Sequence, residues 1–129
     1  MASVALVDSN VFISLLRARI DPVSWLGKRF EDVYTCGIVR MEVLRGQKSA
    51  SQREALESFF DVLCNIPTDN SLWEEATELA WQLDRKGRIL PAQDLIIATC
   101  ARRAGVPVLT ADEHFQQVPG ISVIPFLED

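Results

Sequence analysis

A short apolar run close to the N-terminus, Val4 to Val7, stops abruptly at three polar residues, Asp8-Ser9-Asn10. An unbroken apolar run of this length is typical of a parallel strand that is covered on both faces. Apolar residues at helical spacing, Val11, Leu15 and Leu16, follow directly. This beginning predicts an α/β fold in which Asp8 lies at the C-terminal end of the first strand.

The remainder of the chain alternates between helical and strand patterns. Helices are expected where apolar residues recur with a period near 3.6 between cap and stop signals, and strands where short apolar or β-branched runs follow turn residues. The expected helices begin at Asp21-Pro22, at Ile38, at the capping boxes Ser51 to Glu54 and Ser71 to Glu74, and at Leu95; the further strands are 33–36, 107–110 and 121–124. At 129 residues, the chain is expected to form one domain spanning residues 1–129.

The composition, 48% hydrophobic and 24% charged, is that of an ordinary globular protein with a core. The formal charge of −5 argues against a broad basic face that grips nucleic acid. A carboxylate cluster that holds divalent cations nevertheless adds negative formal charge while it presents positive charge to a phosphate. The charge therefore weakens a nucleic-acid function without excluding it.

The N-terminal residues have neither a basic opening nor a long apolar segment, so we expect no signal peptide, no membrane span and a cytoplasmic location. Cys36, Cys64 and Cys100 are odd in number and lie in apolar segments. We therefore expect buried, reduced thiols without a disulfide or a zinc site.

Four separated carboxylates are the strongest functional signal. Asp8 and Asp112 end predicted strands, Asp94 lies in the first turn of a predicted helix, and Glu42 lies beside an apolar helical stripe. Each acid alone can be explained by turn formation or by the helix dipole. Together they point to one site, because ligands of open α/β sheets bind beyond the carboxyl ends of the strands and clustered acids need a cation.

Oxygen ligands favour Mg²⁺, with Mn²⁺ as a possible substitute. One or two such ions can activate water for in-line attack on a phosphodiester, so no nucleophilic side chain is required. The single histidine, His114, is expected to be a surface or loop residue near this site.

Four segments resemble the PIN-domain family, and more narrowly its VapC-type toxins: Leu6 to Val11, Val39 to Val43, Asp94 to Ala98 and Leu109 to Asp112. The stretch from Gly87 to Asp94 and the pair His114-Phe115 are similar to such toxins as well. The resemblance extends over nearly the whole chain. It implies a three-layer fold with a central parallel sheet of four to five strands flanked by helices.

The resemblance also implies an activity and partners. The chain would be a Mg²⁺-dependent endoribonuclease, a hydrolase of RNA phosphodiester bonds, and the toxin of a toxin–antitoxin module. It would form a homodimer and, with a small antitoxin protein, a heterotetramer or larger complex. The catalytic and metal-binding quartet would be Asp8, Glu42, Asp94 and Asp112, with Ser9, Asn10 and Thr110 as supporting polar residues. Glu113 directly follows Asp112, which leaves open which of the two faces the metal.

Arg45 and Lys48 follow the Glu42 helix and are the preferred candidates for contact with RNA phosphates. No aromatic-rich platform for RNA is evident, since Trp25, Trp73 and Trp81 occupy helical positions that favour core or interface packing. The target RNA cannot be read from these residues.

Two alternatives remain open on the sequence. In a phosphatase-like or receiver-like domain, Asp8 would be phosphorylated, although Asn10 stands where such a phosphatase would have a second Asp. In a PIN-like binding module, the same fold would bind partners without catalysis.

Overall fold

The structure is a computed structural model that describes residues 3–127, and within these residues five strands form one parallel sheet in the order β3-β2-β1-β4-β5. The expected α/β architecture with four to five parallel strands is therefore confirmed. The strands are β1 (Val4–Val7), β2 (Asp32–Cys36), β3 (Cys64–Ile66), β4 (Val108–Thr110) and β5 (Val123–Pro125).

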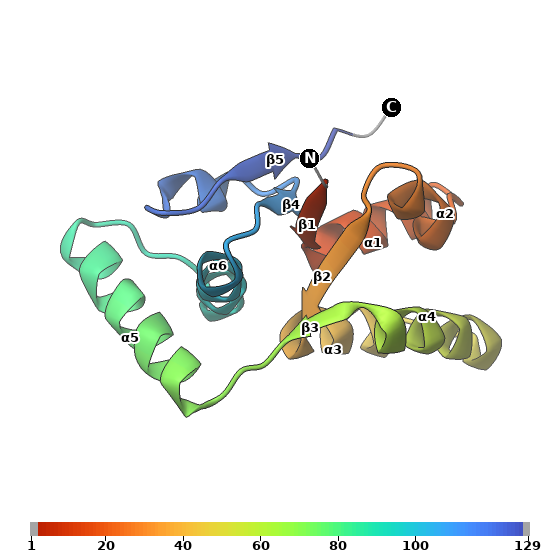
Figure 1. The fold of residues 1–129 in the computed structure, drawn as a ribbon, viewed down its shortest axis with the longest axis horizontal. Coiled ribbons are helices and arrows are strands. Elements are labelled where there is room, and N and C mark those ends of the chain that lie inside the picture. Colours follow the sequence, from red (N-terminus) through yellow and green to blue (C-terminus); the bar gives the residue numbers. More distant parts are fainter. Residues whose placement is uncertain (1–2, 128–129) are drawn as a thin grey trace.

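Helices cover both faces of the sheet, which gives three layers (Figure 1). They are α1 (Ser9–Arg17), α2 (Pro22–Gly27), α3 (Gly37–Arg45), α4 (Ala50–Val62), α5 (Asn70–Arg85) and α6 (Ala92–Ala104), with the short 3₁₀ helix η1 (Glu113–Gln117). Helices α1 and α2 lie on one side of β1 and β2, and α5 and α6 lie on the other (Figure 1). No helix between residues 3 and 127 combines the length and apolarity that a bilayer crossing requires.

The central position of β1 explains its unbroken apolar sequence. Ala5, Leu6 and Val7 are fully buried, since β2 and β4 flank the strand and helices cover both of its faces. On one of these faces Phe12 of α1 packs against Phe60 of α4, with ring centroids 5.1 Å apart. Strand β1 is thus the axis of the core, and the chain leaves it at Asp8.

The strand order changes direction at β1. From β1 the chain proceeds to β2 and β3 on one side, and it then crosses back to β4 and β5 on the other side. In open α/β sheets, ligands bind at such a change of direction, in the crevice beyond the carboxyl ends of the two strands, here β1 and β4. Asp8 follows β1 and Asp112 lies just beyond β4, so both acids are placed at this crevice.

Two predicted helix caps are wrong. The side chain of Ser49, not Ser51, caps α4 by accepting a hydrogen bond from the backbone N–H of Gln52. Likewise Asp69, not Ser71, caps α5 by accepting from the backbone N–H of Leu72 at 2.9 Å. In both cases a side-chain oxygen two residues earlier in the sequence caps the helix, so the helix begins two residues sooner than the capping-box spacing indicates.

Strand β3 was not expected, and it corrects the prediction for one cysteine. It is a three-residue edge strand in which Ile66 alone is buried, so it has no apolar alternation to reveal it. Cys64, its first residue, is exposed, whereas Cys36 and Cys100 are buried as expected. All three thiols are free, as predicted.

Candidate active site

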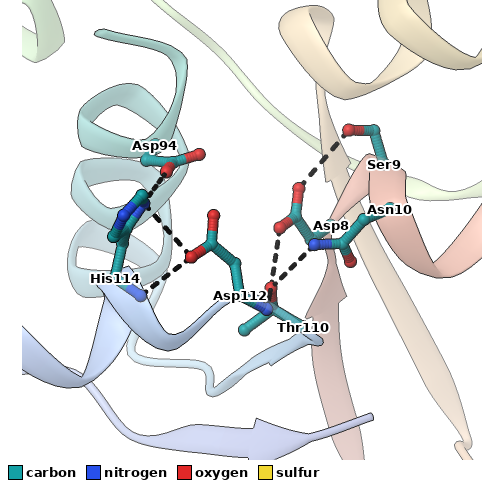
Figure 2. Close-up of polar contacts among 7 residues, drawn as sticks. All are labelled: Asp8, Ser9, Asn10, Asp94, Thr110, Asp112 and His114. Atoms are coloured by element: carbon teal, nitrogen blue, oxygen red, sulfur yellow. Dashed lines mark hydrogen bonds and ion pairs between the residues drawn. The ribbon is translucent and has the colours of Figure 1, made fainter. Parts of the chain in front are cut away.

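Three aspartates approach one another beyond the ends of β1 and β4 (Figure 2). Asp8 follows β1, Asp112 precedes η1, and Asp94 lies in the first turn of α6. Figure 2 shows Asp94 on helix α6 beside His114 and Asp112. The expected meeting of these three acids is therefore observed in the folded chain.

Asp8 is held by a hydroxyl on the neighbouring strand. Asp8 is only 4% exposed, and its Oδ2 accepts a hydrogen bond of 2.7 Å from Oγ1 of Thr110. The same Oγ1 accepts from the backbone N–H of Asp112 at 2.9 Å and from Nδ2 of Asn10 at 3.3 Å. The Thr110 hydroxyl thus donates its single proton to the Asp8 carboxylate, and the N–H groups of Asp112 and Asn10 fix the orientation of the hydroxyl.

Glu42 joins the cluster through Ser9. The Ser9 hydroxyl lies 3.2 Å from Oε1 of Glu42 and 3.4 Å from Oδ1 of Asp8. A hydroxyl has one proton, so it donates to one of these carboxylates at a time. The half-buried Glu42 is thereby placed close enough to Asp8 for their charges to interact.

The second half of the cluster contains the single histidine, His114. Nδ1 of His114 lies 3.2 Å from Oδ2 of Asp94 and 3.2 Å from Oδ1 of Asp112 (Figure 2). One ligand atom from each of these three side chains falls within 4.8 Å of the others, a spacing compatible with a metal ion. The prediction that His114 lies near the site is correct, but His114 is part of the cluster itself.

Burial and mutual repulsion disfavour the ionised acids. The pKa of Asp94 is raised from 3.8 to about 6, first because burial penalises its charge and further by the charges of Asp112 and Asp8, against a hydrogen bond from His114. Burial likewise raises the pKa of Asp8, although the Thr110 hydrogen bond opposes this, and the charges of Glu42 and Asp112 raise it further.

For His114, in contrast, the surroundings favour the charged form. Its hydrogen bond to Asp94 and the charge of Asp112 raise its pKa, because both acids favour the imidazolium. Among residues 3–127, no lysine or arginine forms an ion pair with any of the four acids. At most one imidazolium therefore opposes four carboxylates, which leaves a strong excess of negative charge for a cation to compensate.

Helix capping explains the position of only one of the three aspartates. Asp8 occupies the N-cap position of α1, yet its side chain makes no capping hydrogen bond. Asp94 does not cap α6 either, because Pro91 holds that position. Asp112 does cap η1, accepting from the backbone N–H of His114 at 2.8 Å, and still faces Asp94 through the shared imidazole.

The structure also distinguishes Asp112 from Glu113. Asp112 is half-buried and contacts His114 within the cluster. Glu113 is exposed and is not part of the group of ligand atoms that Asp94, Asp112 and His114 form. Asp112 is therefore the acid that faces the other carboxylates.

The two basic residues expected to contact RNA lie outside the cluster. Arg45 lines a groove of about 520 Å³ between α3 and α4. Gly37, Arg40 and Met41 line the same groove. Lys48 lines a second groove of about 530 Å³ beside α1. Both side chains are exposed and form no ion pair within residues 3–127. They are therefore available to a ligand that extends beyond the carboxylates.

The chain resembles known proteins over most of its length. The sequence model of the PIN domain matches residues 5–121. Ribonuclease VapC18 of Mycobacterium tuberculosis is 31% identical over 106 residues, which cover 78% of this chain and 77% of the relative. Ribonuclease VapC4 of the same organism is 28% identical over 123 residues, which cover 93% and 95%.

A solved structure has the same fold. It is the crystal structure of VapBC2 from Rickettsia felis bound to a DNA fragment from their promoter. Its matching chain has a TM-score of 0.77 at 21% identity, with 95% of this chain and 98% of that chain covered.

Proposed function

Because the chain belongs to the PIN-domain family, we propose that it is a Mg²⁺-dependent endoribonuclease and the toxin of a toxin–antitoxin module. Asp8, Glu42, Asp94 and Asp112 form its catalytic and metal-binding quartet. The observation that carries this proposal is their convergence at the crevice between β1 and β4 without any lysine or arginine partner among residues 3–127. The similar proteins VapC4 and VapC18 of Mycobacterium tuberculosis are named ribonucleases.

The donor atoms fit a hard divalent cation. The quartet supplies carboxylate oxygens, which are the ligands that Mg²⁺ and Mn²⁺ prefer. The pKa of Asp94 is raised to about 6, first because burial penalises its charge and further by the charges of Asp112 and Asp8, and a bound cation would relieve both effects. Asp94 and Asp112 would hold the ion from one side of the crevice and Asp8 from the other, with Glu42 reaching the site beside Ser9.

When bound, the divalent ion polarises the phosphodiester and lowers the pKa of the attacking water. The side chains of this chain prepare the site for that chemistry. Thr110 fixes the direction of the Asp8 carboxylate, and Asn10 fixes Thr110 while its own Oδ1 accepts from the backbone N–H of Ala111 at 3.3 Å. Rigid carboxylates need no reorganisation during the reaction, which is the principal way that such sites lower a barrier.

The surroundings of Asp8 do not favour phosphorylation of this residue. Its two oxygens contact the hydroxyls of Ser9 and Thr110, and no lysine pairs with it within residues 3–127. A receiver-like domain would need such a lysine beside the acyl phosphate. Within the PIN-domain family, the remaining alternative is a module that binds RNA or protein without cutting RNA.

The proposal is tested with the purified full chain and a mixed-sequence single-stranded RNA. We expect cleavage in Mg²⁺, no cleavage in EDTA, and loss of cleavage in Asp8→Asn and Asp94→Asn. Asp84→Asn is the matched control, because Asp84 is an exposed acid on α5 that forms no ion pair within residues 3–127. Cleavage that persists in EDTA would contradict the proposal, and RNA binding without turnover would favour the non-catalytic module.

The partner is proposed to be a small antitoxin protein. Several proteins that share this fold were crystallised as VapBC or FitAB complexes, which supports this assignment. The groove between α3 and α4, with the exposed side chain of Met41, is a suitable surface for a partner segment. Co-purification of the chain with the product of an adjacent small reading frame, and inhibition of RNA cleavage in that complex, would support the assignment.

The assembly is proposed to be a cytoplasmic homodimer of single-domain chains that binds antitoxins to give a heterotetramer or larger complex. Trp73 and Trp81 on α5 are 50% and 56% exposed, so they do not pack in the core of the chain. Large exposed aromatic residues are typical of protein interfaces. Light scattering of the purified chain should give a dimer mass, and a monomer mass for the wild-type chain would refute this assembly.

A further inference from the structure

The histidine beside the carboxylates differs in chemistry from the oxygen ligands that Mg²⁺ prefers. Nδ1 of His114 lies 3.2 Å from a carboxylate oxygen of Asp94 and 3.2 Å from one of Asp112. Figure 2 shows the imidazole between these two side chains, on the side of the cluster away from Ser9. The three donor atoms lie within 4.8 Å of one another.

The backbone at this position is firmly held. Asp112 caps η1 and accepts a hydrogen bond of 2.8 Å from the backbone N–H of His114 itself. The next residue, Phe115, is fully buried in the core. The backbone of His114 is thus held on both sides in the chain, and its side chain contacts the two acids from this position.

Nδ1, rather than Nε2, is the ring nitrogen at the acids, while the side chain as a whole is 47% exposed. With its proton on Nε2, a neutral imidazole offers a lone pair at Nδ1. Two ligands about 2.1 Å from one ion and at right angles lie about 3.0 Å apart. The observed separation of 3.2 Å between Nδ1 and each carboxylate oxygen is close to this value, so little movement is needed.

We propose that Nδ1 of His114 is a ligand of the catalytic metal together with Asp94 and Asp112, and that the site therefore binds Mn²⁺ and related transition-metal ions more tightly than Mg²⁺. This proposal rests on the metal-dependent function proposed above, and it identifies the class of ion. Imidazole nitrogen is a good ligand for first-row transition metals, whereas Mg²⁺ requires oxygen and keeps most of its water. Asp8 and Glu42 remain the oxygen-only side of the site.

The critical measurement is the environment of bound Mn²⁺ in the full chain, observed by pulsed electron paramagnetic resonance. A directly bound imidazole produces nuclear modulation from nitrogen that oxygen ligands do not produce. We expect this nitrogen signal in the wild-type protein and its loss in His114→Asn. The asparagine amide lies about where Nδ1 lies and can keep polar contact with both acids, so this variant preserves the local packing.

Affinities provide a second readout that does not depend on cleavage. In His114→Asn, we expect the dissociation constant for Mn²⁺ to rise by about 10- to 100-fold, as is typical when a group that holds a metal is lost. The affinity for Mg²⁺, measured by competition, should stay close to that of the wild type. Glu113→Gln is the matched control, since this exposed acid on the same 3₁₀ helix is not part of the ligand group of Asp94, Asp112 and His114, and its replacement should leave both affinities unchanged.

The outcomes separate this inference from the proposed function. If Mn²⁺ binds without a nitrogen signal, or with equal affinity in wild type and His114→Asn, then His114 is not a ligand and the metal-dependent ribonuclease stands without it. If neither Mn²⁺ nor Mg²⁺ binds the wild-type chain, the metal-dependent function itself fails. Unfolding temperatures in EDTA establish that His114→Asn is folded; if it is not, the nitrogen signal of the wild-type protein decides the question alone.

Discussion

Replacing Asp94 by asparagine should make the metal-free protein more stable while it removes activity. The pKa of Asp94 in the folded chain is about 6, against an ordinary value of 3.8. This difference of about two pH units, at about 1.4 kcal/mol for each, means that ionising Asp94 costs the native state up to about 3 kcal/mol. Burial is the main cause of this cost, and the side chain of Asp94 is only 10% exposed, but water beside the 47% exposed His114 reduces the penalty. We therefore expect Asp94→Asn to raise the free energy of unfolding by about 1–2 kcal/mol.

The sign of the pH dependence follows from the direction of the shift. A carboxyl whose pKa is raised by folding binds its proton more tightly in the native state, so its contribution is favourable at low pH and is lost as pH rises through about 6. The stability advantage of Asp94→Asn should accordingly be absent near pH 4, grow up to about pH 6, and stay constant above it.

The assay is thermal unfolding in EDTA at several pH values, with Asp84→Asn as the control. For a chain of this size, 1–2 kcal/mol corresponds to an increase in Tm of about 4–8 °C at pH 8. Added Mg²⁺ should raise the Tm of the wild type and leave that of Asp94→Asn nearly unchanged. A lower Tm for Asp94→Asn in EDTA at pH 8, or a stability difference independent of pH, would refute the electrostatic argument.

Three further predictions concern neighbouring features. Thr110→Val should lower the free energy of unfolding, measured in urea, by about 1–3 kcal/mol and should also reduce cleavage, because it removes the 2.7 Å hydrogen bond to Asp8 and leaves the backbone N–H of Asp112 without an acceptor. Thr110→Ser keeps the hydroxyl and should largely restore stability and cleavage, so an equal loss in both variants would contradict this role. Gly105→Ala should lower the free energy of unfolding by about 1 kcal/mol, since Gly105 has φ of 68° although the space around it is open. Gly27→Ala in helix α2 should raise the free energy of unfolding by up to about 1 kcal/mol. The same sign of change for both variants in thermal unfolding would be inconsistent with a backbone effect. The double variant Arg45→Ala with Lys48→Ala should raise KM for RNA at unchanged kcat and weaken its salt dependence, and an unaltered KM would show that neither side chain meets the RNA.

Local patterns were sufficient for most of the elements. The run from Val4 to Val7 matches β1 residue for residue, because a central strand covered on both faces must be apolar throughout. Asp94 falls in the first turn of α6 as predicted, and Gly105 ends that helix in the left-handed conformation. Strand β3 could not be found in this way, since one buried residue in three forms no pattern.

The site could be predicted only in part. Asp8 and Asp112 follow directly from strand ends, but the position of Glu42 depends on how α3 packs against α1, where Ser9 brings the two carboxylates together. His114 was expected near the site, and a signal for its closer role was present. An aspartate that caps a short turn accepts from the backbone two residues later, which here is His114.

The sequence by itself determined the α/β class and the placement of Asp8 at a strand end, and it led to the expectation of a cation near several acids. These properties depend on residues that are close together in the chain, where periodicity and capping act. The tertiary structure alone decided that β4 pairs with β1, which brings Thr110 within 2.7 Å of Asp8 across 102 positions of sequence. Strand order is set by the packing of the whole core rather than by local preference, so only the folded chain could place the two halves of the carboxylate cluster in one crevice.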